Sequence, residues 1–253
     1  MENHGENSQS ATIGQIQKFT GMVLENLPLD LLTKDTLQTL IENPPEIKRV
    51  LSAFVPQPLP VSAAIDVIAD WQKFYQDYFY LAVDLSTVAI PEYQKDFNRV
   101  IIIPQGLMLE DAIDALVRKM KLYTWKNDNR LLNKNVPAND REAKNGAYVI
   151  RIRERVEADV EMKNKSANYL AEKKIAGITL LERLVYELKY FSETGKHLDI
   201  NNITLCSGSR DSDGSVPSVD WNSDDGKLNV DWYYLDNADD YLRARVVVSC
   251  QPF

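Results

Sequence analysis

The stretch VPSVDWNSDDGKLNVDWYY, residues 216–234, alternates apolar and polar side chains twice around a central turn. Val219 and Trp221 share one side of the first run, and Val230 and Trp232 share one side of the second. Because successive side chains of a strand point to opposite faces, this pattern predicts two strands with one apolar and one polar face. The glycine in the intervening SDDGK favours a hairpin, since glycine accepts a positive φ.

The two faces of this hairpin have different tasks. Burial of the tryptophans and valines fixes the register, because each large side chain contributes ~1.5–3 kcal/mol. The opposite face can then vary without unfolding the protein, as a binding surface requires. That face is predicted to carry Ser218, Asp220 and Asn222 on the first strand and Asn229, Asp231 and Tyr233 on the second.

The composition around the hairpin is unusual. Nine of the residues from Asp211 to Tyr241 are aspartate, and none is glutamate, glutamine or methionine. Turn preferences explain the aspartates of DSDG and SDDG. They do not explain Asp220, Asn229 and Asp231, because strands disfavour Asp and Asn. A selection other than β-propensity therefore acts on the polar face.

Upstream of the hairpin, local signals alternate between helix and strand. RVIIIPQGL predicts a buried strand, LEDAIDALVRKM an amphipathic helix and KLYTW another strand, which together form a strand–helix–strand unit. YVIRIRERVEADVE reads as a strand. Thr179 and Glu182 form a capping box that opens a helix, and Gly195 ends it. From Ile203 onward the chain reads as short antiparallel strands and turns.

The beginning of the chain has a different character. Residues 1–11 are expected to be disordered, residues 12–55 to form short helices, and PQPLP at 56–60 to be a stiff connector. The aromatic stripe in the next helix predicts core packing by Trp71, Phe74, Tyr75 and Tyr78. We expect an α+β protein with a helical region and connector at 1–60, an α/β segment at 61–144 packed on the body, and a body at 145–253.

Several motifs of the body resemble a known family. GITLLERLVYELKYFSETGKHLDINNITLCSGSR, SDGSVP, DWYY and LRARVVVS are similar to segments of the variable proteins of diversity-generating retroelements, over residues 145–249. This resemblance implies a C-type lectin-like (formylglycine-generating-enzyme-like) domain at the C-terminus, with a variable region at about 207–249. In that family a reverse transcriptase misreads template adenines. AAY codons can therefore yield Asn, Asp, Tyr, Ser, His, Gly and others, but never Glu, Gln, Lys, Met or Trp.

The resemblance also implies which residues are fixed and which are variable. Trp221, Trp232, Gly214, Gly226, Arg243 and Arg245 would belong to the fixed framework. Tyr233, Tyr234 and Tyr241 are the candidate aromatic anchors, as in paratopes. The expected ligand-binding variable face comprises Asp211, Ser218, Asp220, Asn222, Asn229, Asp231, Tyr233, Asp236, Asn237, Asp239 and Tyr241.

We therefore expect a non-enzymatic protein that binds a protein or another macromolecule, with a basic surface as the favoured target because the face is acidic. The alternatives are a structural or adhesion subunit with a fixed partner, or a Ca²⁺-dependent lectin in which DSDG and WNSDDG supply oxygen ligands. An oxidase with the formylglycine-generating architecture would need a cysteine pair. No cofactor and no bound metal are expected, and the oligomeric state is open.

Bulk properties limit the classes of partner. The net charge of −8 argues against a general nucleic-acid binder and against docking on anionic lipid. No apolar run is long enough for a membrane span, and the first residues lack a signal-peptide pattern. The expectation is cytoplasmic folding, with surface or particle display as the alternative.

The chain has two cysteines, Cys206 and Cys250, which are expected to be buried thiols. Pairing between them is open, because the sequence does not show whether they lie on adjacent strands. His197 is expected to make a structural contact.

Overall fold

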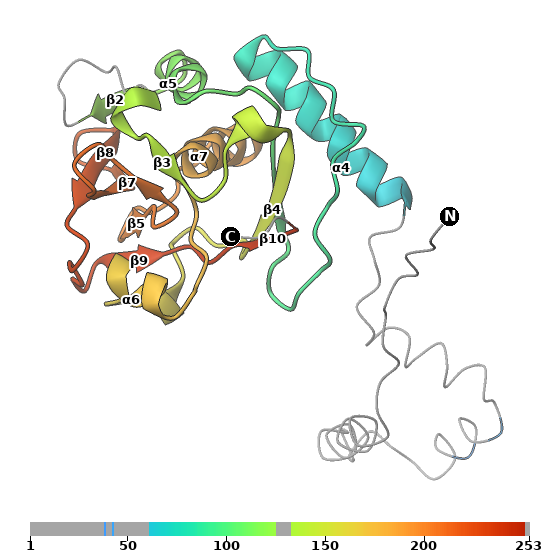
Figure 1. Ribbon diagram of the computed structural model, residues 1–253. Helices are drawn as coiled ribbons and strands as arrows, with labels where there is room; N and C mark the ends of the chain where they lie inside the picture. The colour runs from blue at the N-terminus through green and yellow to red at the C-terminus, as the bar shows by residue number, and fades with distance from the viewer. Residues whose placement is uncertain (1–37, 39–41, 43–60, 125–132, 251–253) are drawn as a thin grey trace, which may run out of the picture. The chain divides into compact units, whose positions relative to one another are not determined.

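The computed structural model describes residues 38, 42, 61–124 and 133–250 (Figure 1). Contacts divide the chain into two units, Met1–Val55 and Pro56–Phe253. In the first unit only Gln38 and Glu42 are described; both are helical, and Gln38 donates a hydrogen bond of 2.7 Å to Glu42. The expected disorder of residues 1–11, the other expected helical positions and the proline-rich connector lie outside the described residues.

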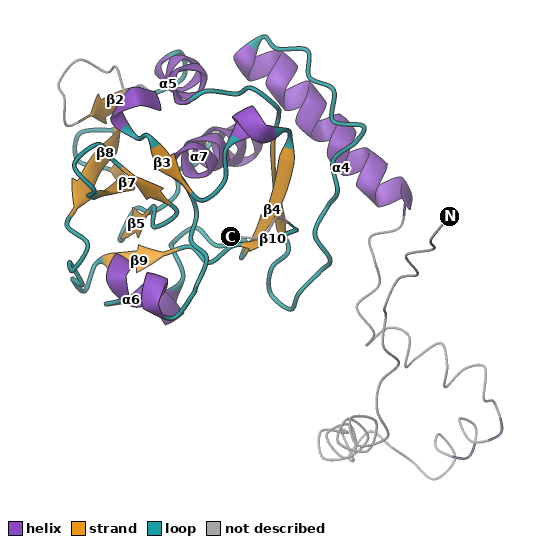
Figure 2. Cartoon of the chain, in the orientation of Figure 1, coloured by secondary structure: helices purple, strands orange, loops and turns teal. Residues whose placement is uncertain are grey.

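The second unit mixes helices with three sheets, which confirms the predicted α+β class (Figure 2). Within the described ranges, no helix has both the length and the apolar character needed to cross a bilayer. Short helical turns connect several of the longer elements: η2 (Asn133–Asn135), η3 (Ala143–Asn145) and η4 (Val160–Met162). The main helices are α4 (Val61–Phe74), which continues as the π-helix η1 (Tyr75–Phe79), α5 (Leu109–Val117), α6 (Ala167–Glu172) and α7 (Leu180–Thr194).

Three sheets organise the strands. The first has the order β1-β4-β10, the second β2-β8-β7-β5-β9 and the third β3-β6. The strands are β1 (Arg99–Ile103), β2 (Lys121–Thr124), β3 (Ala138–Asn139), β4 (Tyr148–Ile152), β5 (Ile203–Leu205), β6 (Ser209–Arg210), β7 (Val216–Asn222), β8 (Lys227–Tyr233), β9 (Leu242–Ala244) and β10 (Val248–Ser249).

The predicted strand–helix–strand succession is confirmed by β1, α5 and β2. Its two strands lie in different sheets, because β1 joins the three-stranded sheet while β2 pairs in parallel with β8. The expectation that the strands from Ile203 onward are all antiparallel is wrong, because β5 pairs with β9 in parallel. These pairings join distant segments, which local periodicity does not encode.

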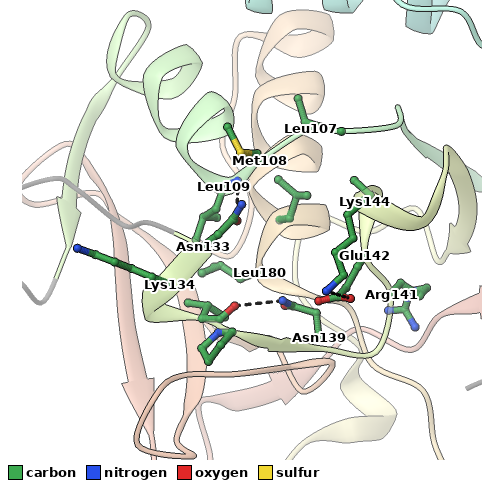
Figure 3. A pocket seen from close by; sticks show the side chains of 15 residues that line it. Leu107, Met108, Leu109, Asn133, Lys134, Asn139, Arg141, Glu142, Lys144 and Leu180 are labelled. Carbon is green, nitrogen blue, oxygen red and sulfur yellow. Dashed lines mark hydrogen bonds and ion pairs between the residues drawn. The ribbon is translucent and has the colours of Figure 1, made fainter.

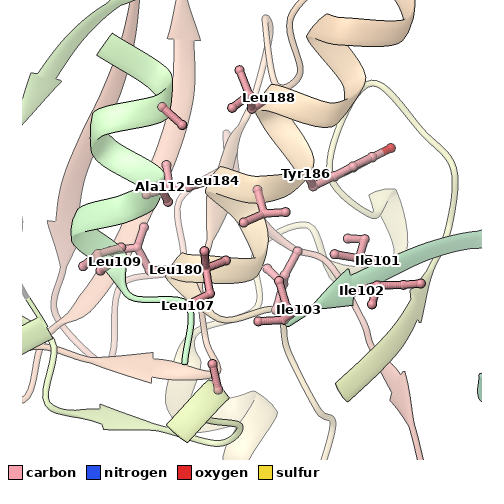
Figure 4. Packing of buried hydrophobic residues seen from close by; sticks show 14 of the residues in the cluster. Ile101, Ile102, Ile103, Leu107, Leu109, Ala112, Leu180, Leu184, Tyr186 and Leu188 are labelled. Carbon is pink, nitrogen blue, oxygen red and sulfur yellow. The ribbon is translucent and has the colours of Figure 1, made fainter. Parts of the chain in front are cut away.

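Helix α7 lies between the two larger sheets and is the centre of the core (Figure 4). Leu180, Leu184 and Leu188 of α7 are fully buried near α5 and the isoleucines of β1, while Leu181 is partly buried. The predicted capping box is confirmed: the Thr179 hydroxyl accepts from the Glu182 amide at 3.3 Å, and Glu182 accepts from the Thr179 amide at 2.8 Å. The helix ends as predicted at Gly195, which has φ 66°.

The aromatic stripe on α4 and η1 packs into the same core. Trp71, Phe74 and Tyr75 are buried, as predicted, while Tyr78 is half-buried and stacks on Phe74. The Tyr75 hydroxyl donates to the backbone oxygen of Ile102 at 2.7 Å. That hydrogen bond satisfies a buried phenol and ties η1 to β1.

The β7–β8 hairpin adopts the predicted two-sided arrangement. Val219 pairs with Val230, and both are completely buried against α7 and the rest of the core. Gly226 in the connecting turn has φ 61°. The tryptophans are less buried than predicted, because both Trp221 and Trp232 keep part of their surface exposed.

The ring of Trp221 is covered on one face by a histidine ring. The His197 ring stacks on it with centroids 3.3 Å apart and planes 3° from parallel. The His197 Nδ1 atom lies 2.9 Å from the buried Glu187 carboxylate. His197 therefore makes the structural contact that we expected of it.

Candidate binding surface

The polar side chains of β7 and β8 lie on the face of the five-stranded sheet that is opposite Val219 and Val230. The register pairs Ser218 with Asp231 and Asp220 with Asn229. The Asn229 side-chain amide donates to Asp220 across the strands at 3.2 Å. The alternation read from the sequence therefore places these polar residues on one continuous face.

This face is hollowed into an open cavity of about 380 Å³. Such a volume lies near the lower end of the range for small-ligand pockets, about 300–1,000 Å³. Five of the residues expected on the ligand-binding face line it, namely Ser218, Asp220, Asn229, Asp231 and Tyr233.

Four further lining residues were not predicted. Tyr123 of β2 reaches the cavity because β2 pairs with β8, where Tyr123 lies beside Asn229. Ile203 of β5 closes the other side. Asp225 and Lys227 flank the hairpin turn and form an ion pair of 3.2 Å. The alternation of β8 places Lys227 on this face in the sequence, whereas the contribution of Tyr123 depends on a distant strand pairing.

The carboxylates of the cavity are unequally solvated. Asp231 is exposed, whereas Asp220 is half-buried. Burial raises the pKa of Asp220 and outweighs the opposing effects of its hydrogen bond from Asn229 and of the Arg183 charge. The charges of Asp199 and Asp231 raise this pKa further. A partly desolvated carboxylate that lines an open cavity is a favourable position for a positively charged ligand group.

Ser218 lies in the floor of the cavity. Its side chain is 1% exposed, and its hydroxyl has no hydrogen-bond partner among the described residues. A buried hydroxyl without a partner costs free energy that a ligand can recover by supplying one.

Tyrosines border the cavity on the side of β8. The rings of Tyr233 and Tyr241 lie 6.3 Å apart at 53°. Burial, together with a hydrogen bond to Tyr241, raises the pKa of Tyr233, so its phenol stays protonated. Tyr234 and Tyr241 are exposed by 78% and 46% of their surface, which leaves both rings available for contact.

The structure places other expected variable residues outside the cavity. Asp211 is 5% exposed, and its carboxylate accepts from the amides of Asp213 and Ser215 at 2.9 and 2.7 Å. It therefore shapes a turn rather than lying on an accessible face, which corrects our expectation for this position. The Asn222 side chain likewise accepts from the amides of the hairpin turn.

The remaining expected positions follow β8 in the connection to β9. The Asp236 carboxylate accepts from Asn168 of α6, and Asn237 accepts from the Tyr234 amide at 2.7 Å. Asp239 is half-buried, and its backbone oxygen accepts from the Leu242 amide at 3.0 Å. These residues border the sheet but do not line the cavity.

A buried charge network supports the sheet from the core side. Asp199 is completely buried and accepts from Arg183 at 2.9 Å and from Arg245 at 2.7 Å. Arg183 also binds Glu187 at 2.8 Å. Arg245, expected to be part of the framework, is 1% exposed, while Arg243 is half-buried.

Sequence reasoning did not find this network as a whole. The i,i+4 spacing of Arg183 and Glu187 was its one local signal. The pairing of both arginines with Asp199 depends on tertiary structure.

A second, larger cavity of about 480 Å³ lies beside the first turns of α5 and α7 (Figure 3). Several of its polar groups already have protein partners. The Arg141 guanidinium donates to Glu182 at 2.7 and 2.9 Å, and Lys144 pairs with Glu142 at 2.6 Å. The Asn139 amide donates to a backbone oxygen at 3.1 Å. This cavity is therefore less suited to bind a charged ligand than the one on the sheet.

The cysteines are both free. Cys206 is fully buried, and burial raises the pKa of its thiol. The expectation that Cys250 is buried is wrong: it is exposed, because it follows the last paired residue of β10. Within the described ranges, no three or more His, Cys, Asp or Glu side chains are grouped so that they could hold a metal ion.

No protein-family model matches this sequence, and the searches of curated proteins and of solved structures also return no match.

Proposed function

We propose that this chain is a non-enzymatic binding protein whose ligand-binding surface is the outer face of the β7–β8 hairpin. The proposal includes the finer identification: a variable protein of a diversity-generating retroelement, with a C-type lectin-like body. The observation that carries it is the opposition of two faces on the same strands. Val219 and Val230 are completely buried, while Asp220, Asn229 and Asp231 open into a cavity.

The chemistry of the face supports binding rather than catalysis. Tyrosines offer large contact areas at low entropic cost, and Asp and Asn offer adaptable hydrogen bonds. The cysteines lend no support to an oxidase, because Cys206 is sealed in the core and Cys250 lies on the surface. A structural or adhesion subunit with a fixed partner would use the same face, so the difference lies in whether the face varies.

The Ca²⁺-dependent lectin remains a second candidate with a separate test. The carboxylate of Asp211 and the side-chain amide of Asn222 accept hydrogen bonds from the backbone of their own turns. These side-chain oxygens are therefore already engaged in the hydrogen bonds of their own turns. A Ca²⁺-dependent rise in melting temperature would favour the lectin, since a ligand that binds only the native state stabilises it.

The decisive experiment for the retroelement proposal is to sequence the locus. We expect a near-repeat of the codons for residues 207–249 next to a reverse transcriptase gene, with differences confined to template adenines. The template should carry AAY opposite the codons for Asp220, Asn229 and Asp231. The Asp220 and Asp231 codons should differ from it at the first adenine, the Asn229 codon can match it, and the codons for Val219 and Val230 should be identical to the template. A locus without such a repeat would leave the fixed-partner function in its place.

A further inference from the structure

The cavity on the sheet has a chemical preference of its own. It contains three carboxylates, Asp220, Asp225 and Asp231, and one cation, Lys227. Lys227 pairs with Asp225 at 3.2 Å, so the carboxylates of Asp220 and Asp231 have no cation of the cavity as a partner. The local field therefore favours a positively charged group.

The acceptors are arranged for a ligand with several N–H donors. Ser218 lies directly opposite Asp231 in the register, and Asp220 is the next residue on the same face of β7. The Ser218 hydroxyl is buried without a partner, and Asp220 receives a side-chain hydrogen bond from Asn229 alone among the described residues. Two carboxylates and one hydroxyl thus line the same cavity with unused acceptor capacity.

The walls of the cavity suit a flat cation. Tyr123 and Tyr233 line it from β2 and β8. A guanidinium group stacks on aromatic rings and donates five N–H bonds in one plane, whereas an ammonium is a compact point charge. We infer that this cavity binds the guanidinium group of an arginine side chain on the protein partner.

This inference rests on the proposed function, since it specifies the ligand chemistry of the same face. It concerns the residues present in this chain, and a retroelement that rewrites Asp220 or Asp231 would change the preference.

The test uses N-acetyl-arginine amide as the probe, titrated into the full chain at low ionic strength and followed by ¹⁵N NMR. We expect saturable shifts at the Asn229 side-chain amide and at the Ser218 backbone amide. The citrulline analogue has the same shape without the charge and should bind at least tenfold more weakly. The lysine analogue should also bind more weakly, because its compact ammonium offers three N–H donors in place of the five of a planar guanidinium and does not stack flat on a tyrosine ring. Equal binding of either analogue would overturn the inference.

Variants locate the site. Asp220→Asn and Asp231→Asn should each weaken arginine binding about tenfold, and Ser218→Ala should weaken it severalfold. The matched control is Asp213→Asn, which removes an exposed carboxylate outside the cavity and should leave the affinity unchanged. An equal loss in this control would show that only the net charge matters and would overturn the inference.

Circular dichroism of each variant verifies that it is folded. Absence of arginine binding in a chain whose locus carries the template repeat would overturn the arginine site alone. Arginine binding in a chain without that repeat would overturn only the retroelement proposal.

Discussion

At the residue scale, the proposed binding face includes a carboxylate whose charged form is disfavoured by burial in the folded protein. Asp220 is half-buried on the outer face of β7, and burial raises its pKa. An unfolded aspartate has a pKa near 3.9. A native pKa above that value means that the carboxyl binds its proton more tightly in the native state. The stabilisation linked to that proton is complete below the unfolded pKa and is lost as pH rises through the native pKa.

Asp220→Asn should therefore stabilise the protein at neutral pH while weakening ligand binding. The asparagine keeps an acceptor for Asn229 and removes the buried charge. We expect the melting temperature to rise by about 2–4 °C at pH 7, equivalent to roughly 1 kcal/mol in a protein of this size. Calorimetry should show the gain shrinking as pH is lowered toward 4. A gain that is independent of pH would contradict the assigned cause.

A second residue-scale prediction concerns Asp199, which neutralises Arg183 and Arg245 in the core. Asp199→Asn leaves two buried guanidinium groups without this carboxylate, and loss of one member of a buried ion pair costs about 3–5 kcal/mol. Urea unfolding measures this cost. The control is Glu161→Gln, which breaks the surface pair with Arg155 and should cost less than about 1 kcal/mol. Equal costs would contradict the proposed role of the network.

At the scale of elements, local signals predicted individual helices and turns well. The capping box of α7, its end at Gly195 and the β7–β8 turn at Gly226 each depend on neighbouring residues, which the sequence displays directly. The parallel pairing of β2 with β8 does not, because about a hundred residues separate the two strands. For the same reason Tyr123 was not predicted at the cavity.

In the candidate site too, some residues were predictable from local sequence patterns and others depend on tertiary structure. Alternation correctly grouped Ser218, Asp220 and Asp231 on one face, because period-two patterning is local to each strand. It could not show that Asp211 is buried, since turn and surface aspartates have the same sequence pattern. The half-burial of Trp221 depends on its stacking against His197, which also requires the tertiary structure.

The backbone at Gly208 passes very close to the backbone of Gly177 and Ile178, which predicts that a larger side chain at Gly208 destabilises the fold. A Cβ atom added at Gly208 would lie 2.6 Å from the backbone oxygen of Gly177 and 3.2 Å from the backbone of Ile178. Gly208→Ala should therefore push β6 away from the start of α7 and cost about 1–3 kcal/mol, the usual range for overpacking. Thermal unfolding measures the loss. Ser212→Ala, at an exposed position nearby, should leave the melting temperature unchanged. If Gly208→Ala also left it unchanged, the close approach of the two backbones would be contradicted.

At the scale of the whole molecule, the proposed function assigns stability and recognition to opposite sides of one sheet. The core side contains α7, the buried valines and the Asp199 network, while the outer side contains the acidic cavity. Most surface substitutions change stability by less than about 0.5 kcal/mol, whereas shortening a buried aliphatic side chain costs far more. This difference would let one framework carry many binding faces.

Two matched libraries test this separation most directly. One randomises Asp220, Asn229 and Asp231 among Asp, Asn, Ser and Tyr, and the other applies the same set to Val219, Leu228 and Val230 on the same two strands. Protease-resistant display of each library measures the fraction of variants that fold. We predict that most members of the first library fold and that almost none of the second do. Equal folded fractions in the two libraries would contradict the account.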